Sequence, residues 1–502
     1  MLRWRLMLPG HRAPWGFSLM ASVLIAIFLA QGFLASRVKS PVFDETGDIS
    51  AGLSYVQSGE IRANLQHPPL LKELAGVSLW LGGVRLPETP QVHEMLAGGG
   101  ERTAGSELIA ANGPDRVMFL ARLPFLILAA ALGVLLWWWG RQIAGDTAAL
   151  AALFLYTLSP NILGHGYLVT LDVGLAAFTV LFFYSLWRYL EAPDWARLVV
   201  CGVAMGLMLC AKFSALFLLP VAALLLVMAR RTGPLLLMGL IASLVIQAVY
   251  LSPGGLYLYG LGMQRVNADH NPDYLVFLGG KLQHSFPAYF PMAYLLKEPI
   301  AAILLLGVGI YAARKLPARW FLMLPPVAIF AAHMAFADDL GVRYIIPALP
   351  FLYLLGGIGA AWLIAQGMTG RIAVGALAGW LLFTSFAIAP DHLSYFNEAA
   401  GGWRGGTSWL DDSNVDWGQG IKQLKAWADL HAPGRKIKLA YFGSFPPTAY
   451  GLNAEPLDDL MKAPAPGLYA VSAHFVARTP AEWLRRPPTA IVGHSIYVYD
   501  IR

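Results

Sequence analysis

The chain has 502 residues, of which 57% are hydrophobic and only 13% are charged. Soluble domains carry about 25% charged residues, so this composition excludes a soluble domain on a single anchor and predicts a polytopic membrane protein. The formal net charge of +6 does not require a nucleic-acid partner, because excess Lys and Arg in membrane proteins mark the cytoplasmic loops. The two cysteines, Cys201 and Cys210, share one apolar segment, so we expect no structural disulfide.

About eleven apolar stretches are predicted to cross the membrane as helices. The first follows Arg3, Arg5 and Arg12 and is long for the core of a signal peptide, so we interpret it as an uncleaved first span. The predicted spans are residues 15–35, 117–140, 147–161, 167–187, 197–210, 213–229, 234–251, 293–313, 320–337, 344–364 and 372–389.

The distribution of basic residues predicts the orientation of these spans. With the N-terminus in the cytoplasm, every second connection is basic, as at Arg141, at Arg230-Arg231 and at Arg371, whereas the loops between them hold few basic residues. The loops 36–115 and 252–292 and the tail 390–502 are then external. In a bacterium this places a transmembrane domain, 1–389, in the inner membrane and a C-terminal domain, 390–502, in the periplasm.

The tail has the composition of a small α/β domain. A helix is predicted over 421–430, and strands are predicted over 436–442, 467–475 and 491–501. The proline pairs at 446–447 and 487–488 separate these elements.

An acidic pair, Asp44-Glu45, follows the first span directly, and Asp48 lies one helical turn further on. A helix is predicted over 46–58, ending at Gly59, with the pair at its N-terminus, where the helix dipole favours an ionised carboxylate. A second helix is predicted over 70–81, after His67 and two prolines. Taken alone, the acidic pair fits a solvated helix cap better than it fits chemistry, and His67 taken alone fits a structural role better than a functional one.

Further ionisable residues lie at the external ends of other spans. Asp172, in the segment 159–172, is costly near the membrane unless it faces protein or a wet cavity. Cations and aromatic residues of the second external loop and its surroundings suit a lipid phosphate and the first isoprene units, although ordinary snorkelling and an aromatic belt explain them equally well. These residues are Arg265, Lys281, His284, Tyr289, Lys297 and Arg343.

The order of these elements resembles the GT-C membrane glycosyltransferases, in the branch of the protein O-mannosyltransferases and aminoarabinose transferases. The Asp-Glu pair and the Pro-Pro-Leu helix start are followed by Ser-Pro…Thr-x-Asp at 159–172, Ala-Lys-Phe at 211–213, Tyr-Phe-Pro…Lys-x-Pro at 289–299 and Arg-Tyr-x-x-Pro at 343–347. Segments 394–402 and 412–419 resemble the tail of bacterial members. Aminoarabinose transferases carry Lys before the two prolines, where this chain has His67, so the same acceptor is not implied.

The resemblance implies a GT-C fold and inverting transfer of a sugar from a polyprenyl phosphate to an acceptor at the periplasmic face. A carboxylate at the interface can deprotonate an acceptor hydroxyl, and cations can stabilise the leaving phosphate. We therefore expect Asp44 to be the base, Glu45 a helper or acceptor ligand, and Asp172 a group that orients acceptor or sugar. The expected phosphate ligands are Arg265, Lys281, Lys297 and Arg343, and the expected acceptor contacts are Asp48, His67, His284 and Tyr289.

The expected partners are the lipid-linked donor, the bilayer, and an acceptor that is a lipid, a glycan or a protein. We expect a monomer without metal or other cofactor, because the sequence has no tight His/Asp/Cys ligand spacing. The main alternative is a transporter or flippase of lipid-linked sugars, which would need charged or broken-helix elements near the bilayer midplane. A scaffold protein acting through its tail would need far fewer spans. The sugar stays open among mannose, aminoarabinose, galacturonic acid and others.

Overall fold

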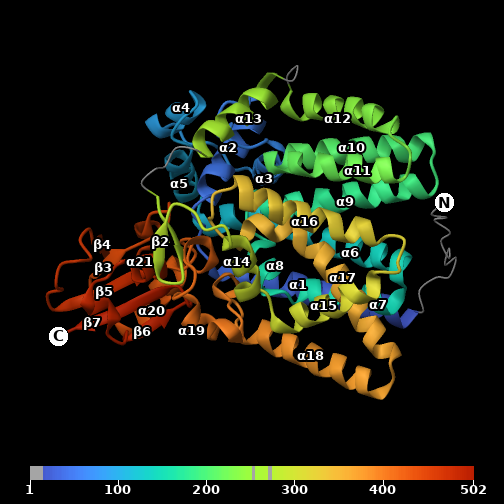
Figure 1. Ribbon diagram of the computed structural model, residues 1–502. Coiled ribbons are helices and arrows are strands. Elements are labelled where there is room, and N and C mark those ends of the chain that lie inside the picture. Colours follow the sequence, from blue (N-terminus) through green and yellow to red (C-terminus); the bar gives the residue numbers. More distant parts are fainter. Residues whose placement is uncertain (1–14, 252–254, 269–273) are drawn as a thin grey trace.

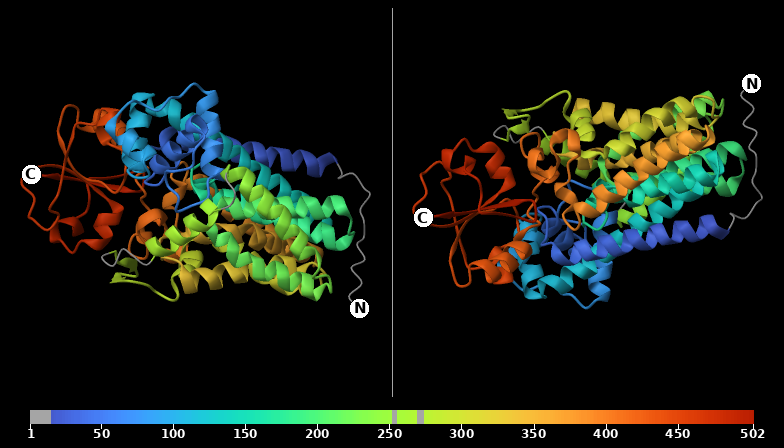
Figure 2. Two further views of the ribbon diagram at one scale, coloured as in Figure 1. Left: turned by 90° about the horizontal axis from the view of Figure 1, so that it is seen from above. Right: turned by 90° about the horizontal axis from the view of Figure 1, so that it is seen from below.

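The computed structural model describes residues 15–251, 255–268 and 274–502. A bundle of long helices forms one part of the molecule and a small β-sheet with its helices forms the other, at the end of the bundle opposite Trp15, where the first helix begins (Figures 1 and 2). The predicted class, a helical membrane protein with a small C-terminal α/β unit, is confirmed.

Six helices in the described part are long and apolar enough to cross a membrane. Their apolar composition explains why they form helices that face lipid or each other, since a lipid-exposed span must satisfy its backbone groups internally. They are α1 (Trp15–Val38), α6 (Pro114–Ala144), α9 (Leu171–Glu191), α16 (Arg319–Phe336), the 3-10 turn η2 (Val342–Ala348) continued by α17 (Leu349–Ala365), and α18 (Met368–Ala387).

Two bent helix pairs raise this number to eight if each pair is one span. One pair is α12 (Pro234–Tyr250) with the first part of α13 (Gly255–Ala268), and the other is α14 (Tyr289–Lys297) with α15 (Ile300–Ala313), bent by 114°. Three shorter apolar segments accompany them, α7 (Asp146–Thr157), α10 (Trp195–Ala211) and η1 (Phe213–Leu218) with α11 (Leu219–Met228). The predicted number of eleven spans stays a prediction.

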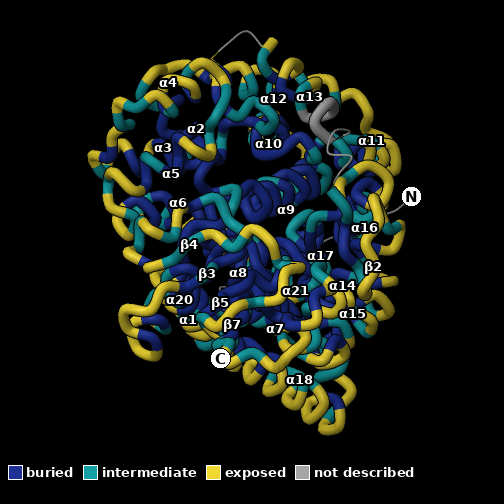
Figure 3. Tube along the Cα trace, turned by 90° about the vertical axis from the view of Figure 1, so that its left-hand side faces the viewer, coloured by how far each residue is buried: buried dark blue, intermediate teal, exposed yellow. Residues whose placement is uncertain are grey.

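The helix α9 runs through the centre of the bundle. It is buried along most of its length in Figure 3, whereas α18 is largely exposed at the outside. The short helix α8 (Pro160–His165) precedes it. Because α9 begins at Leu171, the segment Thr170 to Asp172 lies where this central helix starts.

Four helices between the first two spans cover the tail side of the bundle: α2 (Glu45–Ser58), α3 (Leu70–Leu81), α4 (Pro90–Leu96) and α5 (Glu101–Ala111). The helix predicted over 70–81 and the stop at Gly59 are confirmed, since Gly59 adopts a left-handed φ of 71°. Glycines let α2 and α3 pack backbone against backbone. A Cβ atom on Gly52 would lie 1.9 Å from the carbonyl oxygen of Lys72.

The tail begins with short helical turns, η3 (His392–Ser394), η4 (Glu398–Ala400), α19 (Gly402–Gly406) and η5 (Asp412–Asn414), and then forms a five-stranded sheet. The strand order is β4-β3-β5-β7-β6, with β3 parallel to β4 and β5, and β7 antiparallel to β5 and β6. The strands are β3 (Ile437–Ala440), β4 (Ala454–Pro456), β5 (Gly467–Ser472), β6 (Ala490–Val492) and β7 (Ile496–Ile501).

The helix α20 (Ile421–His431) packs its apolar side on one face of this sheet. Alternation along the strands explains this, because Leu468 and Ala470 join the core under α20 while Tyr469 and Val471 join the larger core on the other side. The prediction of a single strand over 491–501 is wrong. Gly493 and His494 both have φ near 57–58°, so the chain turns there and forms the hairpin of β6 and β7.

Candidate active site

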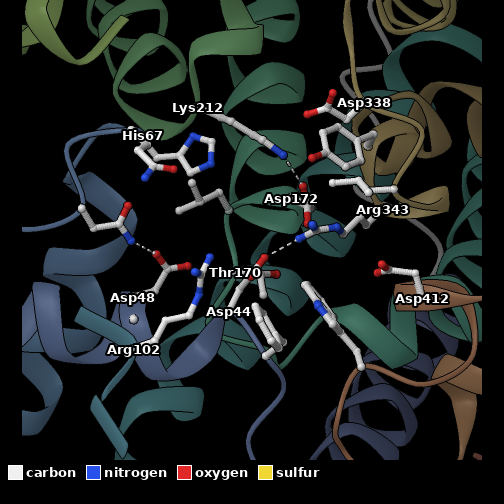
Figure 4. Close-up of a pocket in the computed structure, with 18 of the residues that line it drawn as sticks. Asp44, Asp48, His67, Arg102, Thr170, Asp172, Lys212, Asp338, Arg343 and Asp412 are labelled. Atoms are coloured by element: carbon white, nitrogen blue, oxygen red, sulfur yellow. Dashed lines mark hydrogen bonds and ion pairs between the residues drawn. The ribbon is translucent and has the colours of Figure 1, made fainter. Parts of the chain in front are cut away.

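A cavity of about 710 Å³ lies where the end of the bundle meets the tail (Figure 4). Its walls come from helix ends and loops that are far apart in the sequence. They are the start of α2, the segment 64–67, the start of α5, the start of α9, Lys212 after α10, the segments 274–284 and 338–344, and three tail residues, Asp412, Trp417 and Phe442.

The tail holds Asp44 at this cavity through the backbone. The amide of Ser40 donates to the carbonyl of Gln419 at 3.1 Å, and the amide of Phe43 donates to the carbonyl of Trp417 at 2.8 Å. Asp44 then accepts a 2.7 Å hydrogen bond on Oδ2 from Nη1 of Arg343. The Arg343 guanidinium carbon also lies 4.3 Å from the Trp417 ring centroid, so the tail positions both members of this ion pair.

A second ion pair lies beside the first, at the start of α9 (Figure 4). Lys212 donates a 2.7 Å hydrogen bond from Nζ to Oδ1 of Asp172, and both residues are buried. The extended residue Lys212 separates α10 from η1, which explains how a cation reaches this level of the bundle. Thr170, two residues before Asp172, also lines the cavity.

Asp48 and His67 form the wall on the side of α2 and the 64–67 segment (Figure 4). Asp48 accepts a 3.0 Å hydrogen bond from Nδ2 of Asn64, and burial raises the pKa of its carboxyl. Burial lowers the pKa of His67, and Lys212 and Lys72 lower it further, so its imidazole is neutral at pH 7. A neutral imidazole can accept or donate a hydrogen bond but supplies no charge for a phosphate.

The cavity is acidic. Among the residues that the structure describes, seven carboxylates line it, from Asp44, Asp48, Glu101, Asp172, Asp338, Asp339 and Asp412, together with three Arg or Lys side chains, Arg102, Lys212 and Arg343. Among the described side chains, these three cations are the ones that can attract an anionic ligand in the cavity. Across residues 15–251, 255–268 and 274–502, no group of three or more His, Cys, Asp or Glu side chains has the arrangement to hold a metal ion.

Six of the residues proposed from the sequence line the cavity, and they come from five separate segments. They are Asp44, Asp48, His67, Asp172, His284 and Arg343. His284 is exposed, which places it at the rim. The structure thus brings together Asp44, Asp172 and Arg343, which lie far apart in the chain.

Glu45 lies behind the cavity wall rather than in it. Its side chain is fully buried and accepts hydrogen bonds from Nε of Arg122 at 2.8 Å and from Nη2 of Arg122 at 2.6 Å. It also accepts from the backbone amides of Val42 and Val169. All of its acceptor capacity is thus used inside the protein, which leaves none for an acceptor substrate.

Three of the other predicted phosphate and acceptor ligands do not line the cavity. Lys297 is buried and donates to the carbonyl oxygens of Leu393 (2.7 Å) and Asn414, and the hydroxyl of Tyr289 accepts from Nδ2 of Asn414. Lys281 is exposed on the strand β2 (Lys281–Gln283), which pairs with β1 (Val276–Leu278) and is not part of the cavity lining. The side chain of Arg265, on α13, lies outside the described part of the structure.

Sequence reasoning missed most of the tail's contribution. Asp412 reaches the cavity from a backbone with φ of 53°, a left-handed conformation that a non-glycine residue adopts at a cost. Burial raises the pKa of its carboxyl. Phe442 stacks on Phe43 with ring centroids 5.7 Å apart. The sequence signal for this contribution is the 412–419 motif, but the motif alone does not indicate which wall of the cavity its residues form.

Comparison with known proteins found one matching family model. Residues 114–255 match the model of the dolichyl-phosphate-mannose-protein mannosyltransferases. This segment contains α6 to α12 and therefore includes Thr170, Asp172 and Lys212 of the cavity. No curated protein matches the chain.

Solved structures with a similar fold include three membrane glycosyltransferases. The apo structure of ArnT from Cupriavidus metallidurans is 15% identical, with 97% of this chain and 98% of that chain covered, and a TM-score of 0.49. AglB, an oligosaccharyltransferase from Archaeoglobus fulgidus, is 13% identical, with coverage of 89% and 62% and a TM-score of 0.48. The Pmt1-Pmt2 protein O-mannosyltransferase complex of S. cerevisiae is 17% identical, with coverage of 53% and 39% and a TM-score of 0.34.

Proposed function

We propose that this chain is a GT-C membrane glycosyltransferase that transfers a sugar from a polyprenyl phosphate to an acceptor hydroxyl, with Asp44 as general base. The proposal starts from the match of residues 114–255 to a family whose name includes a dolichyl-phosphate sugar. One observation carries it furthest: a carboxylate, Asp44, and a cation, Arg343, lie 2.7 Å apart in the wall of one cavity.

Asp44 and Arg343 suit the two groups that take part in a displacement at the anomeric carbon, the attacking hydroxyl and the leaving phosphate. Asp44 removes the proton of the acceptor hydroxyl as its oxygen forms a bond to that carbon. The bond from the anomeric carbon to the phosphate oxygen breaks, and the phosphate leaves with the electron pair. Arg343 is placed to stabilise this developing negative charge, since a fixed cation is most effective where charge appears in the transition state. Attack from the face opposite the phosphate inverts the configuration.

The position of the cavity suits a donor whose tail stays in the bilayer. Its polar walls come from helix ends, namely the start of α2, the start of α9, the end of α10 and the start of η2. A polyprenyl chain is too apolar to leave the membrane, so its phosphate can be reached only near such helix ends. With the orientation predicted from the basic loops, this end is periplasmic.

A transporter of lipid-linked sugars is the rival function. It would hold its substrate near the midplane between broken helices. The bent pair α14 and α15 is a break of this kind, but its buried Lys297 donates to tail carbonyls and does not line the cavity. The ionisable residues of the cavity gather at helix ends, which favours chemistry at the surface over transport.

The test is transfer by the full chain in nanodiscs, with a panel of polyprenyl-phosphate sugars and envelope extract as acceptor. We expect Asp44→Asn to lower kcat by about 10²–10⁴-fold, the usual contribution of a positioned base. Asp115→Asn is the matched control, because Asp115 is an exposed carboxylate that pairs with Lys422 outside the cavity. Near-normal transfer by Asp44→Asn would contradict the assignment of the base, and wild-type protein without activity on any lipid-linked sugar would contradict the function.

A further inference from the structure

A second cavity, of about 530 Å³, lies among the apolar helices and shares no residue with the candidate active site. Residues of five helices line it, from α1, α7, α15, α17 and α18. Thr147 is the one polar residue among the described residues of this lining, and the others are Ala, Val, Leu, Ile, Met and Phe. Sites for small ligands usually measure about 300–1,000 Å³, so this cavity, the apolar groove, is large enough to hold one.

The apolar groove begins at the ends of its helices that lie away from the tail (Figure 1). Phe17 is the third residue of α1, and Thr147 is the second residue of α7. Ile364 belongs to the last turn of α17, and Val374 lies in the second turn of α18. The candidate active site lies at the opposite end of the spans, since Asp44 comes after the end of α1.

The hydrocarbon chains of the bilayer can reach the apolar groove. Leu19, Met20 and Val23 of α1 line it and are 54%, 54% and 49% exposed. Along α7 the lining runs from Thr147 to Leu155, which is about 12 Å at 1.5 Å per residue. One leaflet contributes about 15 Å, which is half of a hydrocarbon core of about 30 Å. The groove therefore has a depth close to that of one leaflet, and its walls are open to a lipid chain.

Arg371 marks the polar end of the groove. Val374, Ala378 and Leu381 line the groove at spacings of four and three residues, so they share one face of α18. Arg371 precedes Val374 by three residues, so it lies on the same face, one turn closer to the start of the helix. Its side chain is exposed, and it forms no ion pair or hydrogen bond within residues 15–251, 255–268 and 274–502. Its charge is thus available to a group outside the protein.

A hydrocarbon chain below an anionic head group matches these two features. Apolar walls form only dispersion contacts, and a groove without a filling chain forfeits them. A basic residue at the membrane surface attracts an anionic head group, and the guanidinium group of arginine can bind a phosphate with two parallel hydrogen bonds. The polyprenyl donor does not fit, because its phosphate belongs beside Arg343, at the other end of the spans.

We propose that the apolar groove binds one anionic phospholipid, with a chain between α1 and α18 and the phosphate at Arg371. With the orientation predicted from the basic loops, this lipid belongs to the cytoplasmic leaflet. The site does not depend on the proposed function, because none of its residues lines the candidate active site.

The test is native mass spectrometry of the full chain, released from nanodiscs with equal amounts of anionic phosphatidylglycerol and zwitterionic phosphatidylcholine. We expect wild-type protein to retain one lipid per chain, with phosphatidylglycerol preferred. Arg371→Gln should lower the ratio of bound phosphatidylglycerol to phosphatidylcholine by about fivefold, the usual contribution of one basic residue near an anionic surface. Ala378→Phe adds a ring to the wall of the groove, so it should remove the retained lipid of either kind.

Two matched controls separate the groove from general contact with lipid. Ala376→Phe adds the same ring two residues away, where the side chain is exposed and does not line the groove. Arg231→Gln removes an exposed arginine between α11 and α12, at the same end of the bundle and outside the groove (Figure 1). Both variants should retain lipid as wild-type protein does.

The inference would be overturned if wild-type protein retained no lipid, if it retained both phospholipids equally, or if Ala378→Phe retained as much lipid as Ala376→Phe. Polyprenyl phosphate added to the nanodiscs distinguishes the two kinds of anionic lipid. It should leave the bound phosphatidylglycerol in place, and its displacement of that lipid would show that the groove takes the polyprenyl chain instead. None of these results depends on transferase activity, so each can fail while the proposed function holds.

Discussion

Arg122 binds Glu45 through two hydrogen bonds, Nε to Oε1 at 2.8 Å and Nη2 to Oε2 at 2.6 Å, with both side chains at most 1% exposed. The two residues are 77 positions apart, on α6 and α2. The remaining Arg122 donors reach the backbone carbonyls of Ser36, Lys39 and Ser40. The pair therefore joins the first external helix, the end of the first span and the second span at one point.

The Arg122–Glu45 pair predicts that substitutions of Glu45 and of its neighbour Asp44 have different effects on stability. Glu45→Gln leaves the buried Arg122 without its counter-charge, and breaking a buried pair in this way costs about 3–5 kcal/mol. We expect a marked fall in the melting temperature of Glu45→Gln in nanodiscs, measured by tryptophan fluorescence. Asp44→Asn should keep a near-normal melting temperature because its side chain is partly exposed to the cavity. Equal melting temperatures for the two variants would contradict the prediction that Glu45 stabilises the fold more than Asp44 does.

Much of the fold could be predicted because it depends on local pattern. Apolar runs give the spans, and the first was predicted at 15–35 against Trp15–Val38 in the structure. The helix at 70–81 follows from two prolines that can start a helix but not continue one. The 491–501 strand was wrong because a turn at Gly493 and His494 interrupts an otherwise continuous β-type sequence.

The site was harder to predict because its charges are paired over long distances. Glu45 and Lys297 have the residue types of catalytic and phosphate-binding groups, but their partners, Arg122 and the carbonyl of Leu393, lie 77 and 96 residues away. No local pattern reveals such a partner. The tail residue Trp417 lies at the cavity beside Asp44 because the amide of Phe43 binds its carbonyl, which again depends on tertiary packing.

Arg343 offers a prediction about the donor. Its Nη1 binds Asp44, while its Nε is buried with no partner in the described part of the chain. Lysine keeps the charge but lacks the planar fork that binds phosphate with two parallel hydrogen bonds. We therefore expect Arg343→Lys to raise KM for the lipid-linked donor by about tenfold or more, with a smaller effect on the acceptor.

The measurement is initial rates at varied donor, with Arg435→Lys as control. Arg435 is an exposed arginine that pairs with Asp500 on β7 and does not line the cavity, so its exchange for lysine should change neither constant. A donor KM that stays at the wild-type value in Arg343→Lys would show that the phosphate is bound by another cation of the cavity.

Asp416 predicts how stability depends on pH. Its side chain is fully buried in the tail beside Trp417, its Oδ1 accepts a 3.0 Å hydrogen bond from the amide of Gly418, and burial raises its pKa from 3.8 to about 6. Between these values Asp416 binds more protons in the folded chain than in the unfolded chain, so its contribution to folding stability falls as pH rises from about 4 to about 6. The loss is at most about 3 kcal/mol, because one pKa unit corresponds to about 1.4 kcal/mol.

Asp416→Asn keeps the Oδ1 acceptor but cannot ionise, so the variant should become more stable relative to wild-type protein as pH rises through this window. Melting temperatures of both proteins at pH 4.5, 5.5 and 7 in one buffer series measure this difference, and a difference independent of pH would contradict the raised pKa of Asp416.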